Sequence, residues 1–179
     1  GGSHSLTLDA NGDVWAFGNN KNFQLGSGEV KSSSIPLKIA SLQRIAGISC
    51  GFGFSVCVDD EGSVWSFGHN ACNQLGYGDC EIQETPRMLT GMPPIRTVHC
   101  GGFHTVCLSQ EGVIWSFGLN HKGQLGVGDS MEHIGPCEIQ TKPIIDVSCG
   151  EYHTIALTDT GTPLGCGHGD SNQLGLGNS

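Results

Sequence analysis

Histidines at one recurring position are the first residues of this sequence whose type and spacing could do chemistry. The position recurs about every 50 residues and holds His4, His104 and His153. Converging imidazoles could bind a metal ion or relay protons. However, equivalent positions of a repeat need not converge on one point, and Phe54 fills the position in the second copy. We therefore interpret the three histidines as structural groups whose rings bond to the backbone of an adjacent strand.

The nine cysteines could serve as metal ligands or redox groups, and several of them follow the same repeat. Cys50, Cys100 and Cys149 share one register, while Cys57 and Cys107 share another. No Cys-x-x-Cys pair is present, so the sequence lacks the common signature of zinc ribbons and thiol oxidoreductases. We interpret these residues as small buried hydrophobes and all nine cysteines as reduced thiols. Reduced cysteines predict an intracellular protein, cytoplasmic or nuclear.

No segment carries a complete catalytic, cofactor-binding or metal-binding motif. Residues 9–13 begin like a calcium-binding loop, but the glycine comes too early and no glutamate stands at loop position 12. The segment aligns with residues 59–62 and predicts a hairpin turn. Neither a Walker-type phosphate loop nor a Gly-x-Ser-x-Gly nucleophile motif occurs. We therefore expect no catalytic residue, no cofactor and no metal ligand, and hence a protein that is not an enzyme.

The composition narrows the classes of partner. The 179 residues include 8 Lys+Arg and 17 Asp+Glu, which give a formal net charge of −9. This acidic balance argues against direct binding of nucleic acid, whose phosphates attract Lys and Arg. No apolar run approaches the roughly 20 residues of a membrane span. The 29 glycines, among ample aliphatic residues, favour an all-β protein with many tight turns.

A repeat of about 50 residues organises the whole chain. Its most regular motif, Gly-x-Val/Ile-Trp-x-Phe-Gly, starts at residues 12, 62 and 112, and a degraded copy starts at residue 161. The recurring tryptophans are Trp15, Trp65 and Trp115, and the recurring glutamines of a Gln-Leu-Gly motif are Gln24, Gln74, Gln124 and Gln173. One residue is deleted between Pro136 and Gly150. The repeat units are therefore residues 1–50, 51–100, 101–149 and 150–179, the last of them incomplete.

Each unit predicts four short strands. They are expected at segments such as 95–100, 104–108 and 113–117, with a weaker fourth strand that follows a proline, as at 86–89. Four strands in about 50 residues are typical of a β-propeller blade, because radial repetition hides the sheet edges.

Two expectations concern the third strand of the units. Trp65 and Phe67 share one face of their strand, so we expect Trp65 and Trp115 to be largely buried between blades. In the last unit, Pro163 and Leu164 replace the β-branched and tryptophan positions. Because proline removes a ladder donor, we expect that strand to be shorter or less regular than its counterparts.

These motifs resemble the repeat of the regulator of chromosome condensation family. The resemblance rests on Gly-x-Val-Trp-x-Phe-Gly, Asn-x-x-x-Gln-Leu-Gly-x-Gly and Gly-x-x-His-Thr, and it covers the whole chain. It implies a seven-bladed β-propeller, of which this chain would supply about three and a half blades. A full ring needs roughly 350 residues at this repeat length. We therefore expect either a piece of a longer chain or a short form that pairs with itself.

The resemblance implies binding rather than catalysis. We expect a non-catalytic protein–protein interaction module or scaffold within a larger multidomain protein, with a small GTPase, a chromatin protein or a ubiquitination substrate as partner. The alternatives are a guanine-nucleotide exchange factor for a small GTPase and a chromatin-associated adaptor. Exchange in the founding member relies on a complete propeller face and an inserted β-wedge. No insertion breaks the repeat here, so we expect no exchange by this chain alone.

The loops after each Gln-Leu-Gly-x-Gly motif vary most between units, and variable loops on a constant frame are where repeat proteins bind. They span residues 29–34, 79–84 and 129–134, and the last two are acidic with Ile or Met among the carboxylates. The candidate partner-binding residues are Asp79, Glu81, Glu84, Asp129, Met131, Glu132 and His133. Solvated loops without a partner are the alternative interpretation.

Apolar residues without a polar cap lie in the first and last units. They include Leu6, Leu8, Val14, Trp15 and Phe17 at one end and Leu164, Leu174 and Leu176 at the other. Exposed apolar faces of this kind usually meet a partner. We expect the 179-residue chain to self-associate as a two-fold dimer, or these faces to be met by further blades.

Overall fold

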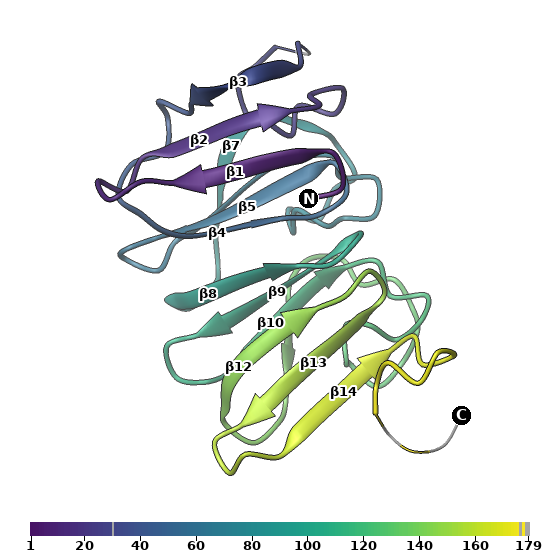
Figure 1. Ribbon diagram of the computed structural model, residues 1–179. Helices are drawn as coiled ribbons and strands as arrows, with labels where there is room; N and C mark the ends of the chain where they lie inside the picture. The colour runs from purple at the N-terminus through teal and green to yellow at the C-terminus, as the bar shows by residue number, and fades with distance from the viewer. Residues whose placement is uncertain (30, 176, 178–179) are drawn as a thin grey trace.

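The computed structural model describes residues 1–29, 31–175 and 177, and within them it contains strands and turns but no helix. Fourteen strands form four antiparallel sheets, which we call blades 1 to 4 in chain order (Figure 1). The all-β class and the partial propeller predicted from the sequence are confirmed. In the described part of the chain, no helix is long and apolar enough to cross a membrane.

Strands that follow one another in the chain pair within each blade. Blade 1 comprises β1 (His4–Leu8), β2 (Val14–Gly18) and β3 (Ser33–Lys38). Blade 2 comprises β4 (Ile45–Cys50), β5 (Phe54–Asp59), β6 (Val64–Gly68) and β7 (Gln83–Leu89). Blade 3 comprises β8 (Ile95–Cys100), β9 (His104–Ser109), β10 (Ile114–Gly118) and β11 (Cys137–Ile139). Blade 4 comprises β12 (Ile144–Cys149), β13 (His153–Thr158) and β14 (Pro163–Gly167).

A carboxylate closes the hairpin turn of blade 1. Asp9 Oδ1 accepts hydrogen bonds from the amides of Asn11 at 2.9 Å and Asp13 at 3.1 Å. Gly12 adopts a φ of 80°, a conformation that residues with a Cβ rarely adopt. The same arrangement recurs in blade 2 around Asp59. The segment that begins like a calcium loop is therefore a hairpin turn.

The first strands of blades 2, 3 and 4 lie next to one another. β4 contacts β8, and β8 contacts β12, so these strands form the inner edge of the array. Backbone hydrogen bonds join the loops that leave them: the Phe52 amide donates to the Gly102 carbonyl and the Gly102 amide to the Glu151 carbonyl, both at 2.9 Å. Figure 1 shows the blades following one another from the purple N-terminal sheet to the yellow C-terminal sheet. Sheets joined along their inner edges in this way form a propeller.

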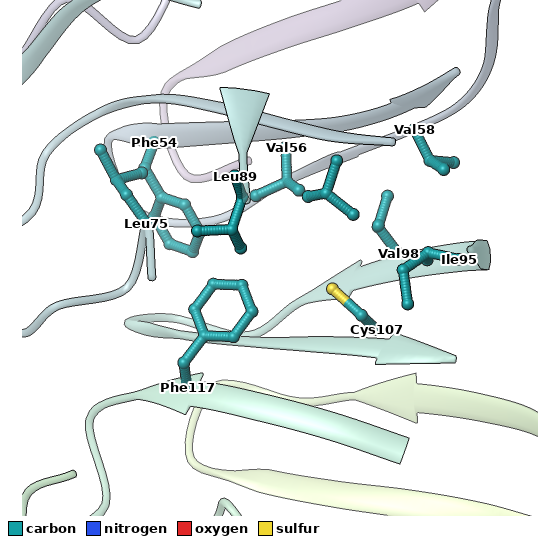
Figure 2. Packing of buried hydrophobic residues seen from close by; sticks show 10 residues of the cluster. Phe54, Val56, Val58, Leu75, Leu89, Ile95, Val98, Cys107 and Phe117 are labelled. Atoms are coloured by element: carbon teal, nitrogen blue, oxygen red, sulfur yellow. The ribbon is translucent and has the colours of Figure 1, made fainter. Parts of the chain in front are cut away.

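Buried hydrophobic clusters fill the interfaces between blades. The cluster between blades 1 and 2 contains Phe67, and the cluster between blades 2 and 3 contains Phe117. Both phenylalanines are fully buried. In Figure 2 the Phe117 ring points toward Leu89 and Leu75 of blade 2. The buried members of the cluster between blades 3 and 4 are all aliphatic.

The tryptophans lie at these interfaces but are not their buried centres. Trp65 packs against the first cluster and Trp115 against the second, yet both keep part of their surface exposed. This placement agrees with the expectation that they are largely buried between blades, while Phe67 and Phe117 are the fully buried rings of these strands. The Trp65 indole reaches the hairpin turn at the end of its sheet, where its Nε1 donates to Asp59 Oδ2 at 3.1 Å.

The third strand of blade 4 is regular, which corrects a second expectation. β14 has five residues, like β2, β6 and β10, and it pairs with β13 in unbroken register from Pro163 to Gly167. The equivalent of Pro163 in blade 1 is Val14, whose carbonyl accepts from the Ile39 amide at 2.9 Å on the outer side. The missing N–H of Pro163 therefore falls on the outer edge of β14, away from β13, and the prediction that this strand is shortened is wrong.

The connection between blades 3 and 4 carries the deleted residue. β11 ends at Ile139 and β12 begins at Ile144, whereas β7 ends at Leu89 and β8 begins at Ile95. The strand before each Cys-Gly pair is the first strand of the next sheet, so each sheet begins inside the preceding repeat unit.

The apolar side chains of blade 1 divide between its two faces. Leu6 and Leu8 pack against the cluster between blades 1 and 2, and Val14 belongs to it. Trp15 and Phe17 alternate with Val14 along β2 and therefore lie on the opposite face, where both are partly exposed. Of the apolar residues expected at the uncapped N-terminal face, only these two aromatic residues lie on it.

Candidate functional site

Asparagine and glutamine side chains of the repeat fix where each variable loop begins. In blade 2, Asn70 Oδ1 accepts from the Leu75 amide at 2.9 Å, and Asn70 Nδ2 donates to the Asp79 carbonyl at 2.9 Å. Gln74 Oε1 accepts from the Cys72 amide at 2.9 Å. The equivalent glutamine bonds are made by Gln24, Gln124 and Gln173. The variable loops therefore start from a rigid base.

The variable loop of blade 3 is organised around Asp129. Its Oδ1 accepts from His133 Nε2 at 2.9 Å and from the Met131 amide at 3.0 Å. These bonds, first of all the one from His133, lower the pKa of the Asp129 carboxyl group. The Met131 side chain, by contrast, is 69% exposed. Asp129 thus anchors the loop, while Met131 is available to a partner.

A pocket lies between the variable loops of blades 2 and 3. Its lining includes Asp79 from one loop and Glu132, His133 and Ile134 from the other. Asn73 Nδ2 of blade 2 donates to the His133 carbonyl at 3.2 Å, which ties the two loops together. The structure thus brings together three of the candidate partner-binding residues from two different repeat units.

The other candidates lie around this pocket or elsewhere. Glu81 is exposed on the loop of blade 2 and Glu84 is exposed near the start of β7, and neither lines the pocket. The Glu84 carbonyl accepts from the Gly28 amide of blade 1 at 3.1 Å, so the start of β7 contacts blade 1. The candidate residues therefore do not form one continuous site.

Sequence reasoning missed several residues of the pocket, among them Ile134 and Asn73. Ile134 is 87% exposed, and it stands beside the carboxylates as the most exposed large hydrophobic residue described. Asn73 supplies the bond between the loops. Ile134 belongs to a loop that does not repeat, so no periodic signal marked it, although its apolar type in an acidic loop was visible. Asn73 stands directly before Gln74, but nothing in the sequence indicated that its amide reaches blade 3.

The electrostatic character of this surface is acidic. Asp79, Glu81 and Glu132 lie on or beside the pocket. The neighbouring cation, Arg87, lies 3.8 Å from Asp79 Oδ2 and 4.2 Å from the centre of the Tyr77 ring. One cation beside several carboxylates leaves a net negative surface, which favours a positively charged partner.

Two of the repeat histidines link neighbouring blades through a hydroxyl group. His104 Nε2 lies 3.0 Å from Thr154 Oγ1, and that hydroxyl donates to the Gln124 carbonyl at 2.9 Å. His4 makes the same contact with Ser55 at 2.8 Å. Because the hydroxyl proton goes to the carbonyl, Nε2 must carry the ring proton and donate it. The expectation that these rings bond the backbone is therefore corrected, since they reach it only through Ser or Thr.

Burial keeps these two rings neutral. It lowers the pKa of His4 and of His104 to about 4. The Nδ1 atom of each ring is buried without a hydrogen-bond partner, so a proton there would be an unpaired charge. The His153 ring is half-buried and has no hydrogen bond in residues 1–29, 31–175 and 177. The neighbouring His153 adds to the effect of burial in lowering the pKa of His104.

The tryptophans differ in their polar partners. Trp15 Nε1 donates to Asp9 Oδ2 at 3.2 Å, as Trp65 does to its own turn. Blade 3 has Ser109 at the position of that aspartate, and Trp115 Nε1 is buried without a partner. The third copy of the repeat has thus lost one hydrogen bond.

The cysteines show no sign of activation. All nine are free thiols. Burial raises the pKa of Cys149 to about 12, and it raises those of Cys57, Cys100 and Cys107 as well. Among the residues that the structure describes, no group of three or more His, Cys, Asp or Glu could hold a metal ion.

Comparisons with known proteins agree with this architecture. A family model described as RCC1-like domain matches residues 1–179. Yeast RCC1 (Prp20), in a structure bound to Kap60, is 25% identical with a TM-score of 0.85, over 99% of this chain and 44% of that one. Human WBSCR16 is 24% identical with a TM-score of 0.82, over 93% and 45%. Saccharomyces cerevisiae Prp20p, described with its binding properties to Gsp1p and histones, is 21% identical with a TM-score of 0.79, over 95% and 43%. The chain thus spans less than half the length of these proteins.

Proposed function

The chain belongs to the family of RCC1-like domains, and from this premise we propose that it is a non-catalytic protein-interaction module. The rigid blades present loops of different sequence from identical positions, which suits partner recognition rather than chemistry. We further propose that it acts as a scaffold within a longer multidomain protein, with a chromatin protein, a small GTPase or a ubiquitination substrate as partner.

The observation that carries this proposal is the pocket between the loops of blades 2 and 3. It combines carboxylates, such as Glu132 and the neighbouring Glu81, with the exposed side chain of Ile134, and Met131 is exposed on the same loop outside the pocket. A basic protein segment with one or two apolar side chains would complement both features. Such a segment would find the loops already ordered by their internal hydrogen bonds, which lowers the entropy lost on binding.

Purified histones are a suitable basic probe, because yeast Prp20p is described with histone binding. We expect the chain to bind them with an affinity that falls as salt concentration rises. The double variant Glu81→Lys/Glu132→Lys should bind at least tenfold more weakly. Its matched control is Glu111→Lys/Asp159→Lys, which makes the same change of charge at exposed hairpin turns on the opposite ends of the strands. Equal weakening in both double variants, or none in the first, would count against the pocket as the binding site.

Guanine-nucleotide exchange on a small GTPase is the second candidate, favoured by the Gsp1p binding described for Prp20p. The rate of nucleotide release from purified Gsp1p, with and without the chain, distinguishes the two. Accelerated release would establish exchange, whereas binding with unchanged release would support a plain interaction module. A chromatin-associated adaptor requires the histone binding tested above.

We also propose that the outer faces of blades 1 and 4 pack against further blades or a second copy of the chain. Trp15 and Phe17 are partly exposed on the first face, and Ile155 and Leu157 on the second. Leu176, expected to contribute, lies outside the described residues. Sedimentation of the 179-residue chain over a wide concentration range tests self-pairing: a dimer that forms with rising concentration supports it, and a monomer throughout excludes it.

The state of the cysteine thiols is relevant to the cellular compartment of the protein. All nine cysteines are free, which supports our proposal that the protein is intracellular, cytoplasmic or nuclear.

A further inference from the structure

The interface between blades 3 and 4 lacks the aromatic ring that fills the other two. Phe67 of β6 lies between blades 1 and 2, and Phe117 of β10 lies between blades 2 and 3. The equivalent residue of β14 is Cys166, since it pairs with β13 at the same register. Leu164 likewise stands where the tryptophan stands in the other blades. The buried members of the third cluster are aliphatic, so no ring replaces the missing one.

A cavity of about 190 Å³ occupies this interface. Its lining is mostly apolar and includes Ile114, Leu125, Gly126, Ile139, Ala156 and Cys166. An apolar protein cavity of roughly 150 Å³ is known to stay dry and to bind benzene. The space between blades 3 and 4 is therefore large enough for one aromatic ring.

Glycines mark where that ring would lie. A Cβ atom added to Gly26 would be 2.9 Å from the Phe67 ring, and one added to Gly76 would be 2.9 Å from the Phe117 ring. Both rings thus rest directly on glycine backbone. Gly126 occupies the same repeat position, but there the neighbouring atom is Cys166 Sγ, 3.2 Å from such a Cβ. A thiol is much smaller than a phenyl ring, so the space beside Gly126 stays unfilled.

The polar side-chain atoms around the cavity already have partners. Cys166 Sγ donates to the Gln124 carbonyl at 3.5 Å, and Thr154 Oγ1 donates to the same carbonyl at 2.9 Å. Thr141 Oγ1 donates to the Lys142 carbonyl at 2.9 Å. A ligand in the cavity would gain apolar contact without displacing these bonds, which favours an apolar molecule over a polar one.

We propose that this cavity binds a small molecule with a single aromatic ring, seated against Gly126 in the place that Phe67 and Phe117 occupy in the other interfaces. The ligand packs against both blades at once and therefore joins blade 4 to blade 3. Because it binds the folded state, it raises the free energy of unfolding with the logarithm of its concentration once that concentration exceeds the dissociation constant.

Toluene is the probe that tests this proposal. It is titrated into the 179-residue chain while the methyl signals of Ile114 and Ile139 are followed by nuclear magnetic resonance. We expect saturable shifts of these two signals and a rise in the unfolding temperature. The Ile45 methyl groups, in the cluster between blades 1 and 2, should not shift. Absence of saturable shifts at Ile114 and Ile139 would overturn the proposal.

Substitutions of Cys166 give the matched pair of variants. Cys166→Phe supplies the ring that the other blades have, and it should bind toluene at least tenfold more weakly while unfolding at a higher temperature without ligand. Cys166→Ala keeps the cavity open and should bind toluene at least as well as the parent chain. Should the phenylalanine variant fail to fold, Cys166→Leu fills part of the space and should also weaken binding. Unchanged toluene affinity in the filled variants would show that toluene binds elsewhere and would refute the proposal.

Discussion

Replacing His104 by phenylalanine should remove a defined part of the acid sensitivity of this protein. The chain already contains this exchange, because Phe54 occupies the equivalent position between blades 2 and 3. At pH 7 the variant loses the bond from His104 to Thr154, but the Thr154 hydroxyl still has the Gln124 carbonyl as acceptor. We expect the free energy of unfolding at pH 7 to change by about 1 kcal/mol.

The magnitude at low pH follows from the pKa of His104, about 4 in the folded protein against a usual value of 6.5. Between these two values the unfolded chain binds a proton that the folded chain does not. Stability due to this residue is therefore complete above pH 6.5 and falls as the pH drops toward 4. At pH 4.5 the loss amounts to roughly 2.5 kcal/mol. The variant lacks the titrating group and should not suffer this loss.

Urea unfolding at pH 7 and pH 4.5 gives the loss in free energy of unfolding for each protein between the two pH values. The effect of His104 is the loss in the parent chain minus the loss in the variant. Other groups titrate in the same range, among them His4, and they cancel when the parent chain and the variant are compared. His121→Phe is the matched control, because His121 belongs to the same blade, in the loop that follows β10, and its side chain is exposed. It should lose as much stability as the parent. If His104→Phe loses as much as the parent chain between the two pH values, then His104 is not held neutral by burial and the reasoning fails.

Three further substitutions test the packing between and within blades. Ser109→Asp should give Trp115 Nε1 the acceptor that Asp59 gives Trp65, and we expect it to raise the free energy of unfolding by about 1 kcal/mol in chemical denaturation; no gain would mean that the indole reaches another acceptor. Gly101→Ala would place a Cβ 2.1 Å from the His104 ring and 2.6 Å from the Gly150 carbonyl, so calorimetry should show a loss of more than about 2 kcal/mol, and an unchanged melting temperature would show that the loops separate freely. Trp65→Ala should cost about 3 kcal/mol, at the low end for a core aromatic because the indole is partly exposed; an unaltered midpoint in urea would contradict its placement at the interface.

The strands were predictable because their signal is local and recurs. Alternation in segments such as Val64–Gly68 and a glycine at the turn indicate a blade in each copy without reference to distant residues. The outer strand of blade 2, expected to follow Pro86, instead begins before it, at Gln83. Val64 and Pro163 hold the same position in blades 2 and 4, and the local sequence could not predict that proline is tolerated there. Whether proline harms a strand depends on which edge its nitrogen faces, and that is a property of the sheet rather than of the residue.

The candidate site was predictable only in part. Repetition located the variable loops, but it could not indicate that Asp79 meets Glu132 and His133, since that depends on how blades 2 and 3 stack. The partner of His104 was missed for the same reason. Its imidazole contacts Thr154 of the next blade. Thr154 lies one repeat unit further along the sequence, and nothing in the sequence indicates this contact.

The hydroxyl group that links two blades donates its hydrogen bond to a main-chain carbonyl oxygen. This has a consequence for how such proteins gain and lose blades. Thr105 donates to the Gln74 carbonyl at 2.8 Å even though Phe54 stands in place of its histidine. Each blade therefore offers its successor the same acceptor, whatever side chains its own loops carry. A gene rearrangement that duplicates or removes one repeat length leaves matching hydroxyl and carbonyl groups at the new junction. This backbone contact is thus one that a new junction would keep, although the side chains packed between blades differ from one interface to the next.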